Sequence, residues 1–197
     1  MWIWLYEIRA FFYVLFLVLV VNCCVLTVEC IAGDKQLKIV TRHTRLVFNS
    51  TDDVVKFNAA INFPSGSSFA SLFGASKSTN VQQELVRKVD LLFEKVQLIL
   101  DMRKEMRKIR IKLFSNRQQL RQAYIKIYGR DSGVRGWYVY DFNTVYLNVS
   151  EVHEGMLAHE LGHAIIDNFL TVRPPRATAE ILARYVDKHL FEEVRQY

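Results

Sequence analysis

The sequence has no cysteine after residue 30. Its three cysteines, Cys23, Cys24 and Cys30, lie close to the N-terminus of a chain of 197 residues. A disulfide framework is therefore excluded from residues 34–197, which are long enough to form one hydrophobic core. The same absence excludes thiolate ligands, so a metal site in this part must use histidine and carboxylate side chains.

Charged residues are absent from residues 10–28, an almost wholly apolar run that follows Glu7 and Arg9. The run is long for the core of a signal peptide and near the minimum length of a membrane span. We therefore expect residues 1–33 to be a cleaved signal peptide or an N-terminal membrane anchor. Residues 34–197 would then be extracytoplasmic: secreted, periplasmic or anchored to the membrane through residues 10–28.

Acidic residues are fewer than basic ones, which gives a net charge of +6. Six basic side chains crowd into residues 102–112: Arg103, Lys104, Arg107, Lys108, Arg110 and Lys112. Such a patch attracts anionic lipid, cell-wall polymers or nucleic acid. The alternative is that these side chains lie at the solvated end of a helix and on the outer face of a strand, and that the patch has no function. Because an exported protein seldom meets nucleic acid, we expect no nucleic-acid partner.

Internal repeats are also absent, and the hydrophobic patterns predict one α+β domain. The expected elements, in chain order, are a strand (38–48), a helix with an apolar stripe (85–99), a strand (108–114), a helix (118–128), a hairpin (136–141 and 144–149) and two helices. Residues 62–80, rich in serine and glycine, are expected to form a flap or a surface loop.

The most informative pattern is His159-Glu160-Leu161-Gly162-His163, an HExxH motif. On a helix its two histidines lie one turn apart on the same face, where they can bind one Zn²⁺ at about 2.0–2.1 Å each. Glu160 is then placed as the general base for a water activated by the metal. The alternative is an ordinary amphipathic helix. We expect Ser150 to be the N-cap of this helix and a small residue at Gly162 to allow close approach of another backbone.

A catalytic zinc needs a third protein ligand. Pro174 and Pro175 end the motif helix, and counting about 1.5 Å per residue along an antiparallel second helix brings Glu180 level with the histidines. A solvated helix carboxylate is the alternative for Glu180. By the same arithmetic Asp187 lies about 10 Å beyond the site. Asp167, one turn after the second histidine, is expected to orient an imidazole through its other ring nitrogen.

Residues 158–186 resemble the HExxH metallopeptidases of the gluzincin type, and most closely the small peptidase-MA-like group. In that group HExxH precedes the pattern Pro-x-x-x-x-Glu-Gly-x-Ala-x-Tyr. Here Glu180, Ala183 and Tyr185 match, whereas Ile181 replaces the glycine.

The resemblance implies a zincin-like domain, with a small mixed sheet, an edge hairpin packed on the active-site helix, and a C-terminal ligand helix. It implies a zinc endopeptidase with Glu160 as base and a peptide or protein substrate. The strand before the active helix would form the sheet edge, and Tyr138, Tyr140 or Tyr146 would stabilise the oxyanion. A second hypothesis is a non-catalytic, envelope-associated binding module that keeps this fold and uses its basic patch. The intact Glu160 favours the enzyme.

Overall fold

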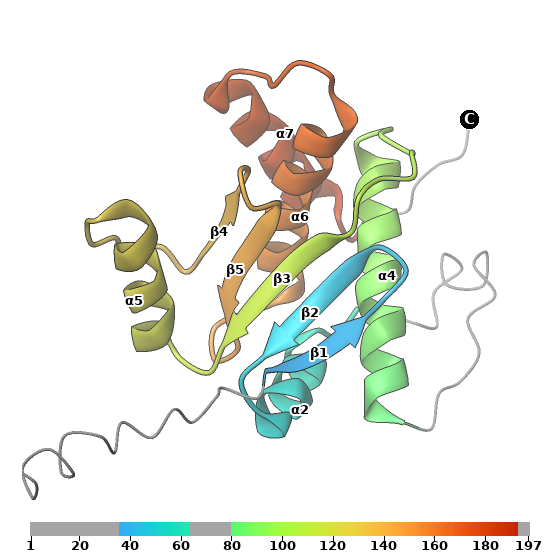
Figure 1. The fold of residues 1–197 in the computed structure, drawn as a ribbon. Helices are drawn as coiled ribbons and strands as arrows, with labels where there is room; N and C mark the ends of the chain where they lie inside the picture. Colours follow the sequence, from blue (N-terminus) through green and yellow to red (C-terminus); the bar gives the residue numbers. More distant parts are fainter. Residues whose placement is uncertain (1–35, 64–79, 193–197) are drawn as a thin grey trace, which may run out of the picture. The chain divides into compact units, whose positions relative to one another are not determined.

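A computed structural model of the chain describes residues 36–63 and 80–192. These residues form a mixed sheet and five helices (Figure 1). The strands are β1 (Leu37–Val40), β2 (Thr44–Phe48), β3 (Ile109–Phe114), β4 (Gly136–Val139) and β5 (Thr144–Asn148). The helices are α2 (Thr51–Ala60), α4 (Val81–Ile99), α5 (Arg117–Tyr128), α6 (Glu154–Phe169) and α7 (Arg176–His189). The predicted α+β class is confirmed.

The five strands form one sheet in the order β1-β2-β3-β5-β4. The pairs β2–β3 and β3–β5 are parallel, whereas β1–β2 and β4–β5 are antiparallel hairpins. The predicted edge hairpin is therefore present, but its outer strand is β4. The expectation that the strand just before the active helix forms the edge was wrong, because β5 pairs on both sides.

The prediction of a single strand over residues 38–48 was also wrong. A turn of three residues, Thr41, Arg42 and His43, separates β1 from β2. Asp90 on α4 accepts a hydrogen bond from each of them. The Thr41 hydroxyl donates at 2.6 Å, and the backbone N–H groups of Arg42 and His43 donate at 3.1 and 3.2 Å. The turn contains neither glycine nor proline, so the usual sequence signal for a hairpin is missing.

Helices cover both faces of the sheet, and they divide the core in two. The larger part joins one face of the sheet to α2, α4 and α6. The smaller part lies under α5 on the other face: Phe114, Leu120, Trp137, Val139 and Tyr146. Strand β4 is thus an edge flanked by α6 on one side and α5 on the other, and this position shapes the candidate site.

Helix α2 was not predicted. Ser50 caps it by accepting a hydrogen bond from the Asp53 backbone N–H, and Phe57 anchors it in the core. Most of the expected flap, residues 64–79, lies outside the described residues, as do the apolar run and the signal or anchor predicted for residues 1–33. No helix within residues 36–63 and 80–192 is both long and apolar enough to cross a membrane.

Candidate metal centre

Helix α6 carries the HExxH motif and is buried along one side. Leu157, Leu161 and Ala164 are fully buried there, so the histidine side faces away from the core. The expected N-cap was wrong. His153 caps the helix by accepting from the Met156 backbone N–H at 3.3 Å, whereas Ser150 donates to the Asn148 side chain.

Helix α7 packs closely against α6, as the glycine in the motif suggested. A Cβ atom built on Gly162 would lie 3.6 Å from Val186 Cγ2 and 3.7 Å from Ala183 Cα. These are ordinary van der Waals distances, so the two backbones are as close as a small residue permits. The close approach brings α7 within side-chain reach of the histidines.

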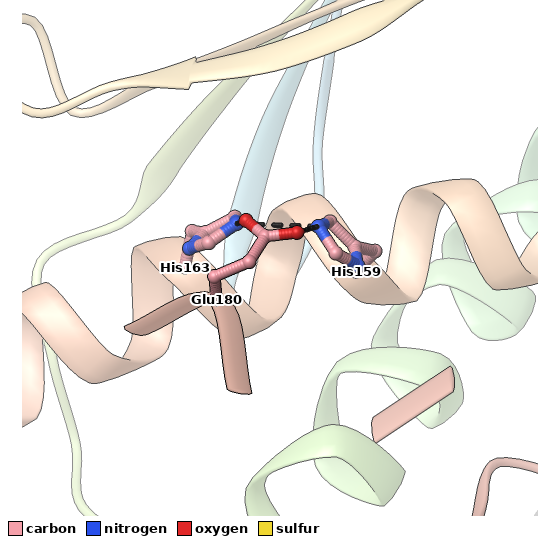
Figure 2. Close-up of side chains that lie close together, drawn as sticks. All are labelled: His159, His163 and Glu180. Atoms are coloured by element: carbon pink, nitrogen blue, oxygen red, sulfur yellow. Dashed lines mark hydrogen bonds and ion pairs between the residues drawn. The ribbon is translucent and has the colours of Figure 1, made fainter. Parts of the chain in front are cut away.

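Figure 2 shows His159, His163 and Glu180 converging, with the Glu180 carboxylate facing the gap between the two imidazoles. His159 Nε2 and His163 Nε2 are 3.2 Å apart. Glu180 Oε1 lies 3.9 Å from the first of these atoms, and Oε2 lies 3.5 Å from the second. Two ligands from α6 and one from α7 therefore face a common point.

These spacings suit one small cation. Ligand atoms held about 2.0–2.2 Å from a tetrahedral Zn²⁺ are about 3.3–3.6 Å apart, close to the separations in this group. The ligand types also suit zinc, because two imidazoles and one carboxylate leave a fourth position open in known catalytic sites. His159, His163 and Glu180 could therefore hold one metal ion.

Burial favours the neutral form of the His163 imidazole, which is the form that binds a metal. Burial, followed by the electrostatic effect of the neighbouring His159, lowers the pKa of His163 to about 4. The imidazole is therefore neutral near pH 7.

Asp187 contacts His159 directly, so the prediction that it would lie beyond the site was wrong. Its Oδ2 atom is 3.0 Å from His159 Nδ1, the ring nitrogen opposite the one that faces Glu180. Glu180 and Asp187 are two helical turns apart on the same face of α7. The prediction compared only the positions of the two backbones along the helix axes. It ignored the lengths of the His159 and Asp187 side chains, which bring their ends into contact.

Asp167 does not orient an imidazole, so that prediction was wrong as well. Its side chain is only 6% exposed, and it pairs with Arg173 Nε at 3.4 Å. Arg173 comes just before the two prolines, where the chain turns back beside the end of α6. The turn thus places the Arg173 guanidinium beside Asp167, and the spacing of residues within α6 could not predict this contact.

Glu160 lies beneath the edge strand and is 8% exposed. A Cβ on Gly136 would lie 3.6 Å from Glu160 Oε1, an ordinary contact, but only 2.6 Å from Leu147 Cδ2, so a larger residue in β4 would require the Leu147 side chain to shift. Burial raises the pKa of Glu160 to about 7, while the charge of His159 and a backbone hydrogen bond from Tyr138 act in the opposite direction.

A cavity of about 700 Å³ opens beside these groups. It is lined by the two histidines, Glu160, Glu180 and residues on both sides of β4. Of the three tyrosines proposed for the oxyanion, only Tyr138 lines it. The Tyr138 hydroxyl donates to Asn143 Oδ1 at 3.1 Å, and burial raises its pKa.

The other two tyrosines are engaged elsewhere. Tyr146 stacks on Trp137, with ring centroids 4.9 Å apart, in the core under α5. Tyr140 is exposed and carries the Arg173 guanidinium over its ring at 4.7 Å. The side chains of Tyr140 and Tyr146 therefore do not reach the cavity.

Several lining residues were not anticipated, among them Tyr124, Tyr128, Arg130 and Arg176. The first three come from α5 and its C-terminal end, far from the motif in sequence. No spacing rule connects them to HExxH, because their approach depends on how α5 crosses the sheet edge.

No protein-family model, no curated protein and no solved structure matches the chain.

Proposed function

We propose that this protein is an exported zinc-dependent endopeptidase. The observation that carries the proposal is the convergence of His159, His163 and Glu180 beside a second, buried carboxylate, Glu160, in one cavity. The export part depends on the uncharged run at residues 10–28. The substrate class is a peptide or protein, because the cavity runs along the edge strand β4, where an extended chain can pair with the backbone.

His159, His163 and Glu180 would hold the ion. A bound Zn²⁺ would supply Lewis acidity, polarising the scissile carbonyl and lowering the pKa of a water. Asp187 contacts the ring of His159 at Nδ1, which would leave Nε2 available to bind the ion.

Glu160 performs the proton transfers in this mechanism. Its carboxylate accepts the proton of the attacking water and then delivers it to the departing amine nitrogen, so that one group serves as base and acid in turn. Its burial beneath β4 excludes bulk water from the transfer. A carboxylate in this position has no obvious use in a purely structural metal site, which favours the enzyme over the binding module.

The decisive experiment changes Glu160→Gln, which removes the base and spares the three ligands. We expect unchanged zinc content and a loss of hydrolysis of about 10²–10⁴-fold, the usual contribution of a general base. Purified full chains would be incubated with a diverse peptide library and read by mass spectrometry. Glu154→Gln, on the same helix, is the matched control and should cleave like the parent protein. Equal cleavage by the Glu160→Gln and parent proteins, or by neither, would favour the binding-module hypothesis.

A further inference from the structure

The cavity beside the histidines carries two arginines that the proposed chemistry does not use. Arg130 follows α5, Arg176 begins α7, and both are exposed. Neither forms an ion pair with any carboxylate of residues 36–63 and 80–192, in contrast to Arg173, which pairs with Asp167. Two guanidinium groups are thus available to a ligand in the cavity.

With a metal ion bound, the charges around the cavity leave these two arginines uncompensated. Its lining carboxylates are Glu160, Asp167 and Glu180. Asp167 is neutralised by Arg173, and Glu180 faces the two imidazoles of the metal site. The three carboxylates formally balance the three lining arginines, Arg130, Arg173 and Arg176, so a bound dication would make the cavity positive. An anionic group on a ligand would therefore be attracted there.

Arg176 lines the cavity together with the ligand group and three aromatic residues, Tyr124, Tyr128 and Trp137. It stands one helical turn before Glu180, or about 6 Å along α7. Its charge also reaches both sides of the cavity. It adds to the lowering of the His163 pKa, which is caused mainly by burial, and it partly offsets the rise that burial causes in the Tyr128 pKa.

We propose that this cavity selects peptides that carry a carboxylate within about two residues of the scissile bond. The distance follows from the position of Arg176 and from the rise of an extended chain, about 3.3 Å per residue. The carboxylate belongs to an aspartate or glutamate side chain or to the free C-terminus of the peptide. The inference rests on the proposed peptidase function and specifies its substrate class.

The test uses host peptides of alanine, leucine and serine that are blocked at both ends and carry one Asp or one Asn at successive positions. A third set carries the Asn and a free C-terminus. For the full, zinc-loaded chain we expect kcat/KM to be about 10-fold higher with a carboxylate near the cleaved bond, the effect of a charge-assisted hydrogen bond. Arg176→Gln and Arg130→Gln should reduce this preference, and 1 M salt should weaken it.

The control is Lys126→Gln, which removes the same charge from an exposed position on α5 outside the cavity. It should keep the preference. Far-UV circular dichroism would verify that each variant is folded. A second measurement is independent of turnover: fluorescence anisotropy of a labelled Asp peptide bound to the Glu160→Gln protein, which Arg176→Gln should weaken about 10-fold.

The outcomes separate the two proposals. Cleavage at equal rates for Asp and Asn peptides overturns carboxylate selection and leaves the peptidase function intact. Binding that depends on Asp and Arg176, without cleavage by the parent protein, supports carboxylate recognition and overturns the peptidase function. A preference restricted to peptides with a free C-terminus supports the inference and assigns the carboxylate to the chain end.

Discussion

Two regions of this molecule place a histidine beside a carboxylate, yet they differ in what the contact can do. The first is the His159–His163–Glu180 group. The second is at the β1–β2 turn, where His43 Nε2 lies 3.1 Å from Glu94 Oε1 beside a cavity of about 770 Å³. Both regions have a cavity of similar size and an imidazole–carboxylate pair, so neither property distinguishes them.

The difference lies in the neighbours of each pair. Glu94 Oε1 also accepts from the Arg42 guanidinium at 3.1 Å, and the His43 ring stacks on Phe93 with centroids 4.5 Å apart. Four basic side chains line this second cavity: Arg42, Arg103, Lys104 and Lys108. They repel a cation. At the first region three ligand atoms from two helices instead face one another, and this convergence is the property that makes a metal site.

Removing Glu180 should have the largest effect on this contrast. We expect Glu180→Ala to weaken zinc binding by more than about 100-fold, beyond the range for losing an outer partner, because two imidazoles alone leave too much of the ion to water. Competition with a chromogenic chelator measures the affinity. Glu94→Ala is the matched control and should bind zinc like the parent chain. An equal loss in both variants would contradict the distinction between the two regions.

Asp187 and Asp167 sharpen the comparison within the first region. Asp187→Ala should weaken zinc binding about 10–100-fold, because the His159 ring loses the partner that orients it. Asp167→Ala should change the affinity by less than about 3-fold, since Asp167 pairs with Arg173 instead of a ligand. The same chelator titration ranks the two variants. A greater loss from Asp167→Ala would show that the ring contact of Asp187 is unimportant for the metal.

The proximity of His159, His163 and Glu180 could be predicted from the sequence because its determinants are local. The histidines share one helix, and the two prolines fix where the next helix begins, so the chain has little freedom in placing Glu180. The supporting carboxylates could not be assigned in this way. Their partners depend on side-chain length in the case of Asp187, and on the path of the turn that carries Arg173 in the case of Asp167.

The β1–β2 turn shows the same limit in the fold. Residues 38–48 were predicted to form one strand, but Asp90 closes a turn in the middle from 49 residues away. The cavity-lining arginines are a similar case, because Arg130 reaches the site only through the position of α5. Contacts between elements that are distant in the sequence leave no periodic signal along it.

The hydrogen bonds of Asp90 to the β1–β2 turn give a prediction about the stability of the fold that is independent of metal binding. Asp90→Ala should lower the free energy of unfolding by about 2 kcal/mol, since it removes three hydrogen bonds to a carboxylate and leaves two backbone N–H groups of the turn without this acceptor. Chemical denaturation provides the measurement. Glu105→Ala, at an exposed position, should change it by less than about 0.5 kcal/mol. An unchanged free energy of unfolding in Asp90→Ala would show that the turn forms without these hydrogen bonds.

The smallest expected effect is at Gly162, where the two helices of the metal site meet. An added Cβ would be in ordinary contact with Val186 and Ala183, so Gly162→Ala requires no movement of α7. Because alanine favours a helix interior over glycine by about 1 kcal/mol, the variant should be slightly more stable than the parent chain, with unchanged zinc affinity. Gly162→Leu is the contrasting variant: its side chain would push α7 away and carry Glu180 from the histidines. Thermal unfolding and the chelator titration together test this pair. If Gly162→Ala lost zinc as Gly162→Leu is expected to, the space between α6 and α7 would be smaller than the distances at Gly162 indicate.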